Sequence, residues 1–351
     1  MKSLFQRLLF SISARFSHVV PARRPLVVTL FGYALVWVAW GVVLSSCGTD
    51  DEAGVLGDWR RRSDFEGVAR SAVSGFVINN IAYMGTGTNA DNDRLKDFWS
   101  YNPERNTWTQ LADFEGEARN AGVGFAIGTK GYIGTGLNAN SDRLKDFWEY
   151  DPVADTWKRI ADFGGTARRN AVAFSIGNKG YVGTGFDGNY VKDFWSYDQT
   201  TGQWAKIASY GGAKRIGAVS FVIDGLAYVG TGNNNGSAER DWWAYNPAQD
   251  LWIEKDDFED EELVQRSYGV GFAIGSKGYI TLGDGSTTVW VYDPATDSWD
   301  DLGAFEGSAR QYAFGFAING KGYITTGSSG SGRFDDLWEF DPNVEQNTDE
   351  N

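Results

Sequence analysis

Short apolar runs recur at near-regular distances along the chain from about residue 58 onwards, between polar stretches rich in Gly, Asp and Asn. Six tyrosines lie in apolar runs that end in glycine, at separations of 49, 49, 47, 51 and 44 residues: Tyr83, Tyr132, Tyr181, Tyr228, Tyr279 and Tyr323. A second aromatic follows in each unit, just before Asn or Asp: Tyr101, Tyr150, Tyr197, Tyr245, Tyr292 and Phe340. Seven residues later comes a tryptophan in five of the units: Trp108, Trp157, Trp204, Trp252 and Trp299. The pattern predicts six copies of one unit built from short β-strands.

Each unit divides into four predicted strands, as the second copy illustrates. Residues 120–127 are rich in Gly and Ala, which suits an innermost strand crowded around a central axis. Residues 131–134 form a short second strand that ends on glycine. Residues 146–150 alternate in the aromatic-rich manner of a half-buried third strand. Residues 151–155 supply turn chemistry before an outer strand that begins near Trp157.

A period near 50 with Gly, Tyr and Trp anchors resembles the kelch repeat over residues 58–342. The resemblance implies one four-stranded propeller blade per repeat, so we expect an all-β, six-bladed β-propeller. The paired glycines of the family stand in the first four units as Gly-Thr-Gly, at residues 85–87, 134–136, 183–185 and 230–232. The fifth unit has Thr-Leu-Gly at 281–283 and the sixth Thr-Thr-Gly at 325–327, which makes these two the less regular blades.

The two ends of the repeat region complement each other. The sixth unit ends after Phe340-Asp341-Pro342 without its outer tryptophan, whereas Trp59 lies in an outer-strand pattern with no blade before it. We therefore expect the strand around Trp59 to pair with the strand around Phe340. This pairing closes the ring and removes exposed strand edges.

Composition narrows the range of functions. The chain has a net charge of −14, and the part after residue 47 has 27 basic and 46 acidic residues, a net charge of −19. Because a surface this acidic repels the phosphate backbone of nucleic acids, we expect no nucleic-acid partner. The only Cys and the only His are Cys47 and His18. The repeats therefore lack the residues for a Ser-His-Asp or Cys-His hydrolase, or for an imidazole metal site, and we expect no metal and no cofactor.

A leader of residues 1–47 precedes the repeats. Five basic residues come before an uncharged apolar run at 26–44, which is long enough to span a bilayer as a helix. The run ends in Leu44-Ser45-Ser46-Cys47-Gly48, which resembles the lipobox of bacterial lipoproteins and implies that Cys47 carries a lipid. The alternative is an uncleaved single-pass membrane helix. Both place the body outside the cytoplasm.

The segments that flank the propeller are acidic. Residues 48–57 follow the cysteine and are interpreted as a tether, and residues 343–351 are interpreted as a tail. We expect a membrane-anchored protein of the outer membrane or the cell surface, held through its lipid anchor.

Every repeat has one arginine where its innermost strand begins, and a propeller gathers these positions near one mouth of its channel: Arg70, Arg119, Arg168, Arg215, Arg266 and Arg310. One interpretation is an anion or sugar-acid site, because guanidinium pairs with carboxylate through two hydrogen bonds. The other is a structural pair with the residue that begins the third strand: Asp97, Asp146, Asp193, Asp241 or Asp336. Thr288 stands at this position in the fifth repeat, which makes Arg266 the best candidate for an available group.

Two further sets of residues are candidates for binding. The loops at 88–93, 137–142 and 233–237 are rich in Asn and Asp, which either ligate calcium through oxygen or simply form turns. Tyr190, Tyr210 and Tyr268 lie off the repeat pattern and could stack on sugars, whereas most tryptophans occupy repeat anchors and are expected in the core.

Two functions remain open. The near-identical repeats favour a non-enzymatic module that binds a protein or carbohydrate ligand through its loop face. The fold also resembles galactose oxidase and a six-bladed sialic-acid epimerase. The absence of His after residue 47 excludes the copper oxidase, whereas an epimerase needs only carboxylates and arginines and stays the alternative.

Overall fold

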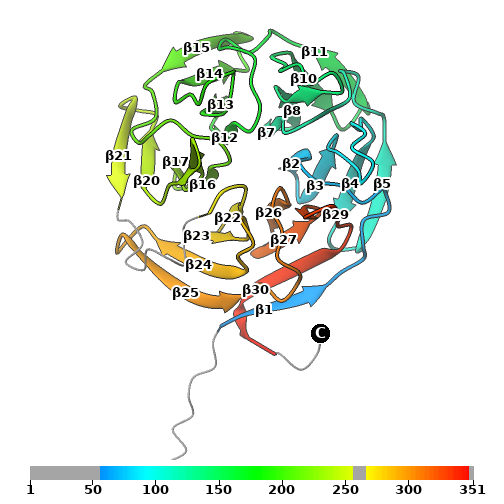
Figure 1. Ribbon diagram of the computed structural model, residues 1–351, viewed down its shortest axis with the longest axis vertical. Coiled ribbons are helices and arrows are strands. Elements are labelled where there is room, and N and C mark those ends of the chain that lie inside the picture. Colours follow the sequence, from blue (N-terminus) through cyan, green and yellow to red (C-terminus); the bar gives the residue numbers. More distant parts are fainter. Residues whose placement is uncertain (1–55, 256–265, 348–351) are drawn as a thin grey trace, which may run out of the picture. The chain divides into compact units, whose positions relative to one another are not determined.

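Six four-stranded antiparallel sheets surround a common axis in the computed structural model, which describes residues 56–255 and 266–347 (Figure 1). The expected leader and Cys47 lie outside these residues. Within the part of the chain that is described, no helix is long and apolar enough to cross a membrane. The expected six-bladed, all-β propeller is confirmed.

The blades follow one another in sequence, each running from its innermost to its outermost strand. The first blade consists of β2 (Ser74–Ile78), β3 (Ile81–Gly85), β4 (Phe98–Asn102) and β5 (Thr107–Leu111). The second consists of β7 (Val123–Ile127), β8 (Lys130–Gly134), β10 (Phe147–Asp151) and β11 (Thr156–Arg159). The third consists of β12 (Val172–Ile176), β13 (Lys179–Gly183), β14 (Phe194–Asp198) and β15 (Gln203–Ile207). The fourth blade consists of β16 (Val219–Ile223), β17 (Leu226–Gly230), β20 (Trp242–Asn246) and β21 (Leu251–Lys255). The fifth consists of β22 (Val270–Ile274), β23 (Lys277–Thr281), β24 (Thr288–Asp293) and β25 (Ser298–Ala304). The sixth consists of β26 (Phe314–Ile318), β27 (Lys321–Thr325), β30 (Leu337–Glu345) and β1 (Leu56–Arg61).

Small residues let the inner strands approach one another around the axis. A Cβ on Gly124 of β7 would lie 2.4 Å from the backbone oxygen of Gly75 in β2, so a larger residue cannot fit there. The second strand is also tightly packed, because a Cβ on Gly131 of β8 would meet the ring of Phe76 in β2 at 1.9 Å. The Gly- and Ala-rich pattern of the innermost strands therefore reflects close packing, as expected.

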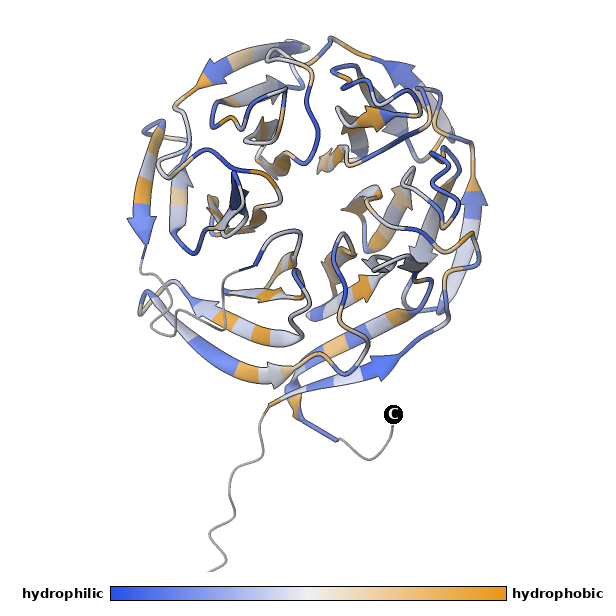
Figure 2. Cartoon of the chain, viewed as in Figure 1, coloured by the Kyte–Doolittle hydropathy of each residue, from blue (hydrophilic) through white to orange (hydrophobic). Residues whose placement is uncertain are grey.

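The hydrophobic core lies between neighbouring blades. Trp157 of the second blade packs on Phe98 of the first, with ring centroids 4.9 Å apart, and Tyr150 packs on Phe98 at 5.0 Å. All six repeat tyrosines are buried. Figure 2 shows hydrophobic segments within the blades and hydrophilic segments in many of the connecting loops.

The ring closes through the first strand, as predicted. β1 pairs with β30, and Trp59 lies directly opposite Phe340, with ring centroids 4.8 Å apart. Arg60 adds an ion pair across this joint, its Nη2 lying 2.6 Å from Oε1 of Glu339. The propeller extends slightly beyond the expected bounds of 58 and 342, because β1 begins at Leu56 and β30 ends at Glu345.

Candidate functional site

The six predicted arginines form a buried ring, and five of them are paired with Asp. Each side chain belongs to a residue that is zero to one per cent exposed. Arg119 donates from Nη1 to Oδ1 of Asp146 at 2.8 Å and from Nη2 to Oδ2 at 2.7 Å. The predicted Arg–Asp pairing recurs in four other blades: Arg70–Asp97, Arg168–Asp193, Arg215–Asp241 and Arg310–Asp336.

Backbone and aromatic groups complete the surroundings of each pair. Nη1 of Arg119 also donates to the carbonyl of Thr135 at 2.9 Å, and its guanidinium lies over the ring of Phe114 at 4.8 Å. Burial alone raises the pKa of Asp146, but hydrogen bonds from Arg119 and Trp148 bring that pKa below its usual value. The guanidinium groups have no surface left for a ligand, so their placement favours the structural interpretation.

Arg266 differs from the other five but is not available either. Its Nη2 donates to Oγ1 of Thr288 at 2.6 Å, and its Nη1 donates to the Thr288 carbonyl at 3.1 Å. The residue is fully buried, and this desolvation lowers its pKa to about 10. The expectation of an available guanidinium in the fifth blade is wrong, because the Thr288 oxygens occupy the position of the carboxylate.

Just after these arginines, one residue from each blade joins a closed circle of backbone hydrogen bonds. Each N–H donates to the carbonyl of the equivalent residue in the preceding blade, at 2.8–3.3 Å, and the N–H of Ala72 closes the circle on Tyr312. All six have φ between 52° and 62°. We call them the axial ring: Ala72, Ala121, Asn170, Gly217, Tyr268 and Tyr312.

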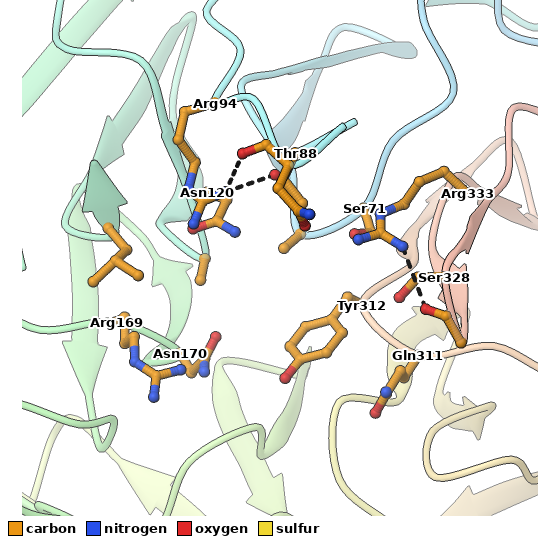
Figure 3. Close-up of a pocket in the computed structure, with 15 residues that line it drawn as sticks. Ser71, Thr88, Arg94, Asn120, Arg169, Asn170, Gln311, Tyr312, Ser328 and Arg333 are labelled. Atoms are coloured by element: carbon orange, nitrogen blue, oxygen red, sulfur yellow. Dashed lines mark hydrogen bonds between the residues drawn. The ribbon is translucent and has the colours of Figure 1, made fainter. Parts of the chain in front are cut away.

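The axial ring lies between two cavities. One, of 270 Å³, is lined by the next residues of all six inner strands. The other, of 310 Å³, we call the mouth cavity; it is lined by residues of the first, second, third and sixth blades (Figure 3). The first cavity has the sixfold repetition of the fold, whereas the mouth cavity departs from it.

Three arginines line the mouth cavity: Arg94, Arg169 and Arg333 (Figure 3). Arg94 donates to Oγ1 of Thr88 at 2.7 Å, and Arg333 donates to carbonyls of its own turn. The guanidinium of Arg169 lies 5.3 Å from the ring centroid of Phe186. None of the described residues that line this cavity is Asp or Glu. The cavity therefore presents positive charge in a strongly acidic protein.

Two buried amide atoms at the mouth cavity have no hydrogen-bond partner: Oδ1 of Asn120 and Nδ2 of Asn170. Asn170 is only 8% exposed. A buried polar atom without a partner is costly, so such atoms are commonly satisfied by water or by a ligand. One of these atoms accepts a hydrogen bond and the other donates one, and a hydroxyl group satisfies either.

A second series of repeat arginines was not predicted from the sequence. Arg94, Arg143 and Arg333 occupy equivalent positions at the base of the loop between the second and third strands, where each pairs with the start of that loop. A signal was present, because Asp-Arg-Leu-Lys-Asp-Phe-Trp occurs at residues 93–99 and again at 142–148. Arg143 lies outside the mouth cavity, exposed and over Phe186 at 5.8 Å.

Tyr190, Tyr210 and Tyr268 all occupy repeat positions, which corrects the expectation that they lie off the repeat pattern. Tyr210 is buried beneath Arg215, its ring centroid 4.8 Å from the guanidinium, as Phe114 is beneath Arg119. Tyr190 pairs with Phe186 at the position that carries arginine in three other blades. Tyr268 belongs to the axial ring.

The Asn- and Asp-rich loops form turns through their own side chains. Oδ1 of Asn89 accepts a hydrogen bond from the N–H of Asp93 at 2.8 Å, and Oδ1 of Asn138 accepts one from Asp142 at 2.9 Å. Oδ1 of Asn233 accepts one from the N–H of Gly236 at 2.8 Å. These contacts match the turn interpretation of the loops.

Comparison with known proteins agrees with the architecture. Residues 61–214 match the family model described as the KLHDC2/KLHL20/DRC7 Kelch-repeats domain. No curated protein matches the chain in sequence. The solved structure titled "Structure of YjhT" is similar with a TM-score of 0.68 and 16% sequence identity, over 79% of this chain and 95% of that one.

Fold and cavity together define a class: a six-bladed β-propeller with an asymmetric, arginine-lined mouth. Within that class, residues 61–214 match a kelch-repeat family model, and the repeat anchors recur through all six blades. The fold is a six-bladed, kelch-type β-propeller. The likeness to YjhT extends to the fold and does not assign an activity.

Proposed function

We propose that the protein is a non-enzymatic binding module whose mouth cavity holds an anionic, hydroxyl-bearing ligand such as the acidic end of a glycan. The observation that carries this proposal is the charge of the cavity. Arg94, Arg169 and Arg333 line it, and no described lining residue is acidic. Guanidinium groups recognise carboxylates by paired, charge-assisted hydrogen bonds.

The same lining argues against catalysis by proton transfer. Arginine stays protonated at neutral pH and serves poorly as a general base. The pKa of Tyr312 is raised, chiefly by burial, so its phenol also keeps its proton. The other polar lining groups are amides and hydroxyls, which orient a ligand without accepting a proton from carbon. Binding is the chemistry that these residues supply best.

The test is calorimetric titration of the purified propeller with glucuronate and, for comparison, with uncharged glucose. We expect glucuronate to bind and glucose to bind at least tenfold more weakly, because hydrogen bonds to charged groups contribute about 1.5–3 kcal/mol. Arg94→Gln should lower the affinity for glucuronate by about tenfold. Equal affinity for the two sugars, or no binding of either, would contradict the proposal.

Arg143→Gln is the matched control for Arg94→Gln. The two arginines occupy the same repeat position in neighbouring blades, but only Arg94 lines the mouth cavity. We expect the Arg143 variant to bind glucuronate as the unmodified protein does. A similar loss in both variants would indicate a general effect of surface charge rather than a site.

One observation keeps the epimerase alternative open. Asp284 lies in the fifth blade next to the axial ring, outside the lining of the mouth cavity, and its Oδ2 accepts hydrogen bonds from the N–H and, at 2.5 Å, from the hydroxyl of Ser267. A carboxylate at a propeller mouth could serve as a general base. NMR of anomer exchange in a sugar acid tests this: acceleration by the protein, lost in Asp284→Asn, would replace the binding module by an enzyme.

We also propose that Cys47 carries a lipid and tethers the propeller to a membrane outside the cytoplasm. The support is the Leu44-Ser45-Ser46-Cys47 run after an uncharged span at residues 26–44. Mass spectrometry of the membrane fraction should find a lipid-modified Cys47 at the N-terminus, and Cys47→Ala should abolish that processing. A Cys47→Ala protein that is still cleaved at the same place would rule the proposal out.

A further inference from the structure

Two neighbouring blades depart from the other four at the axial ring. The first four blades supply Ala72, Ala121, Asn170 and Gly217, which are small or tolerant of left-handed backbone geometry, whereas the fifth and sixth supply Tyr268 and Tyr312. The backbone hydrogen bonds are the same in all six blades. The circle itself therefore does not require an aromatic side chain.

The backbone at these positions is unfavourable for tyrosine. Tyr268 has φ of 59° and Tyr312 has φ of 57°, in the left-handed region that Gly and Asn adopt more readily than bulky residues. Thr86 and its equivalents also have positive φ, but that series has a bulky residue in every blade and so belongs to the architecture. An aromatic residue in two blades alone is a local exception, and local strain of this kind concentrates at functional sites.

The two rings form a wall instead of joining the core. Their centroids are 4.2 Å apart, and both residues are only partly buried. The ring of Tyr268 lies over Gly217, where a Cβ on the glycine would be 2.5 Å from that ring. Tyr312 borders the mouth cavity. Tyr312 thus flanks the cavity on one side with Tyr268 packed against it, and Figure 3 shows the Tyr312 side chain across the opening from Arg94.

The remaining boundaries of the mouth cavity are complementary to such a wall. Ala72 and Ala121 leave space beside Tyr312, and the unpartnered atoms of Asn120 and Asn170 offer one acceptor and one donor. An aromatic face beside amides that match hydroxyl groups suits a sugar ring, which has apolar C–H faces and a polar edge.

We propose that Tyr312 is a stacking platform for the ring of the ligand, that Tyr268 positions it, and that the ligand is consequently a cyclic sugar carboxylate rather than an open-chain or peptide carboxylate. This inference rests on the proposed function and adds the shape of the ligand to its charge. The carboxylate faces the arginines, one face of the ring lies on Tyr312, and the hydroxyls reach Asn120 and Asn170.

The test uses residues that the protein itself places in the axial ring. Tyr312→Asn introduces the residue of the third blade, and Tyr268→Gly introduces that of the fourth. The unmodified protein should prefer glucuronate, a ring, to gluconate, an open chain of the same charge, by about three- to tenfold. Tyr312→Asn should abolish this preference by lowering the affinity for glucuronate to the level of gluconate, and Tyr312→Phe should retain it.

Thermal unfolding separates a platform from simple packing. If Tyr312 is placed for binding, Tyr312→Asn and Tyr268→Gly should melt at or above the temperature of the unmodified protein, because each relieves unfavourable backbone geometry. A lower melting temperature combined with an intact preference for glucuronate would overturn the inference and make the tyrosines structural.

The remaining outcomes distinguish the inference from the proposed function. Binding of glucuronate and gluconate with equal affinity by the unmodified protein would overturn the platform and leave the binding module intact. Failure of both acids to bind would overturn the binding module. If benzoate competes better than glucuronate, the ligand is an aromatic acid and not a sugar. If an acidic peptide binds more tightly than glucuronate, with an affinity that Tyr312→Asn does not change, the inference is also overturned.

Discussion

Two sets of arginines differ sharply within the same propeller. The buried set, exemplified by Arg119, repeats in every blade and has no exposed surface. The mouth set, Arg94, Arg169 and Arg333, comes from only three blades, the first, third and sixth, and borders open space. In the buried set each guanidinium is matched to a fixed oxygen partner of its own blade, whereas in the mouth set none faces a carboxylate among the described lining residues.

The difference shows how function is placed on a repeat fold. A residue that recurs in all six blades solves a problem that all six blades share, here the fastening of the inner strand to the third strand. A residue that varies from blade to blade is free of that task. The mouth cavity consists of such variable positions, and the binding properties proposed here depend on them.

The largest effect is expected when a buried pair is broken. Asp146→Ala leaves Arg119 fully buried without its anion, so the free energy of unfolding should fall by about 3–5 kcal/mol. Urea unfolding followed by tryptophan fluorescence measures this. Arg94→Gln is the comparison, and its stability should change by no more than about 0.5 kcal/mol because it lies at a polar surface. Equal effects on stability would erase the distinction between the two sets.

Acid should also act on the buried set. The pKa values of Asp97, Asp146, Asp193 and Asp336 are lowered in the folded protein: burial opposes ionisation, but the arginines more than offset it. A lowered pKa means that the unfolded chain binds protons first as the pH falls. The stability from these pairs is therefore present at neutral pH and is lost below the ordinary Asp pKa of about 3.9.

Urea unfolding at pH 7, 5, 4 and 3 tests this dependence. The midpoint should change little on account of these groups between pH 7 and 5, and it should fall steeply below pH 4. Asp146→Ala removes one titrating pair, so its midpoint should fall less steeply than that of the unmodified protein. Parallel pH profiles would show that the Arg–Asp pairs do not carry the acid sensitivity.

Most of the fold could be predicted because each blade repeats its own anchors. The spacing of residues such as Tyr132 and Trp157 reports a blade directly, and the missing strand at each end predicted the pairing of Trp59 with Phe340. The Arg–Asp pairs were equally readable, because both members recur in the same places. Repetition supplies six independent observations of each structural rule.

The candidate site could not be predicted in the same way. Arg94 and Tyr312 are 218 residues apart, and they meet at the mouth only because six blades converge on one axis. Periodicity directed attention to the recurring Arg70 series, which proved to be buried. Tyr210 and Tyr268 looked irregular by residue type although both hold regular positions, so alignment by type misjudged them.

The smallest effect is expected where one blade already departs from the buried set. Thr288→Asp gives the fifth blade the carboxylate that the other five have, beside an Arg266 whose pKa is lowered to about 10 by burial. A carboxylate there can accept hydrogen bonds from Arg266 and from Nε1 of Trp290, which now contacts Oγ1 of Thr288 at 3.3 Å. The desolvation of both charges offsets most of this attraction, so the gain should be no more than about 1 kcal/mol. Urea unfolding at pH 7 and pH 3 provides the measurement, because the added stability should be present at pH 7 and absent at pH 3. A variant that is less stable at pH 7 would show that Thr288 and its surroundings already satisfy Arg266, and that the fifth blade reaches the same end by other contacts.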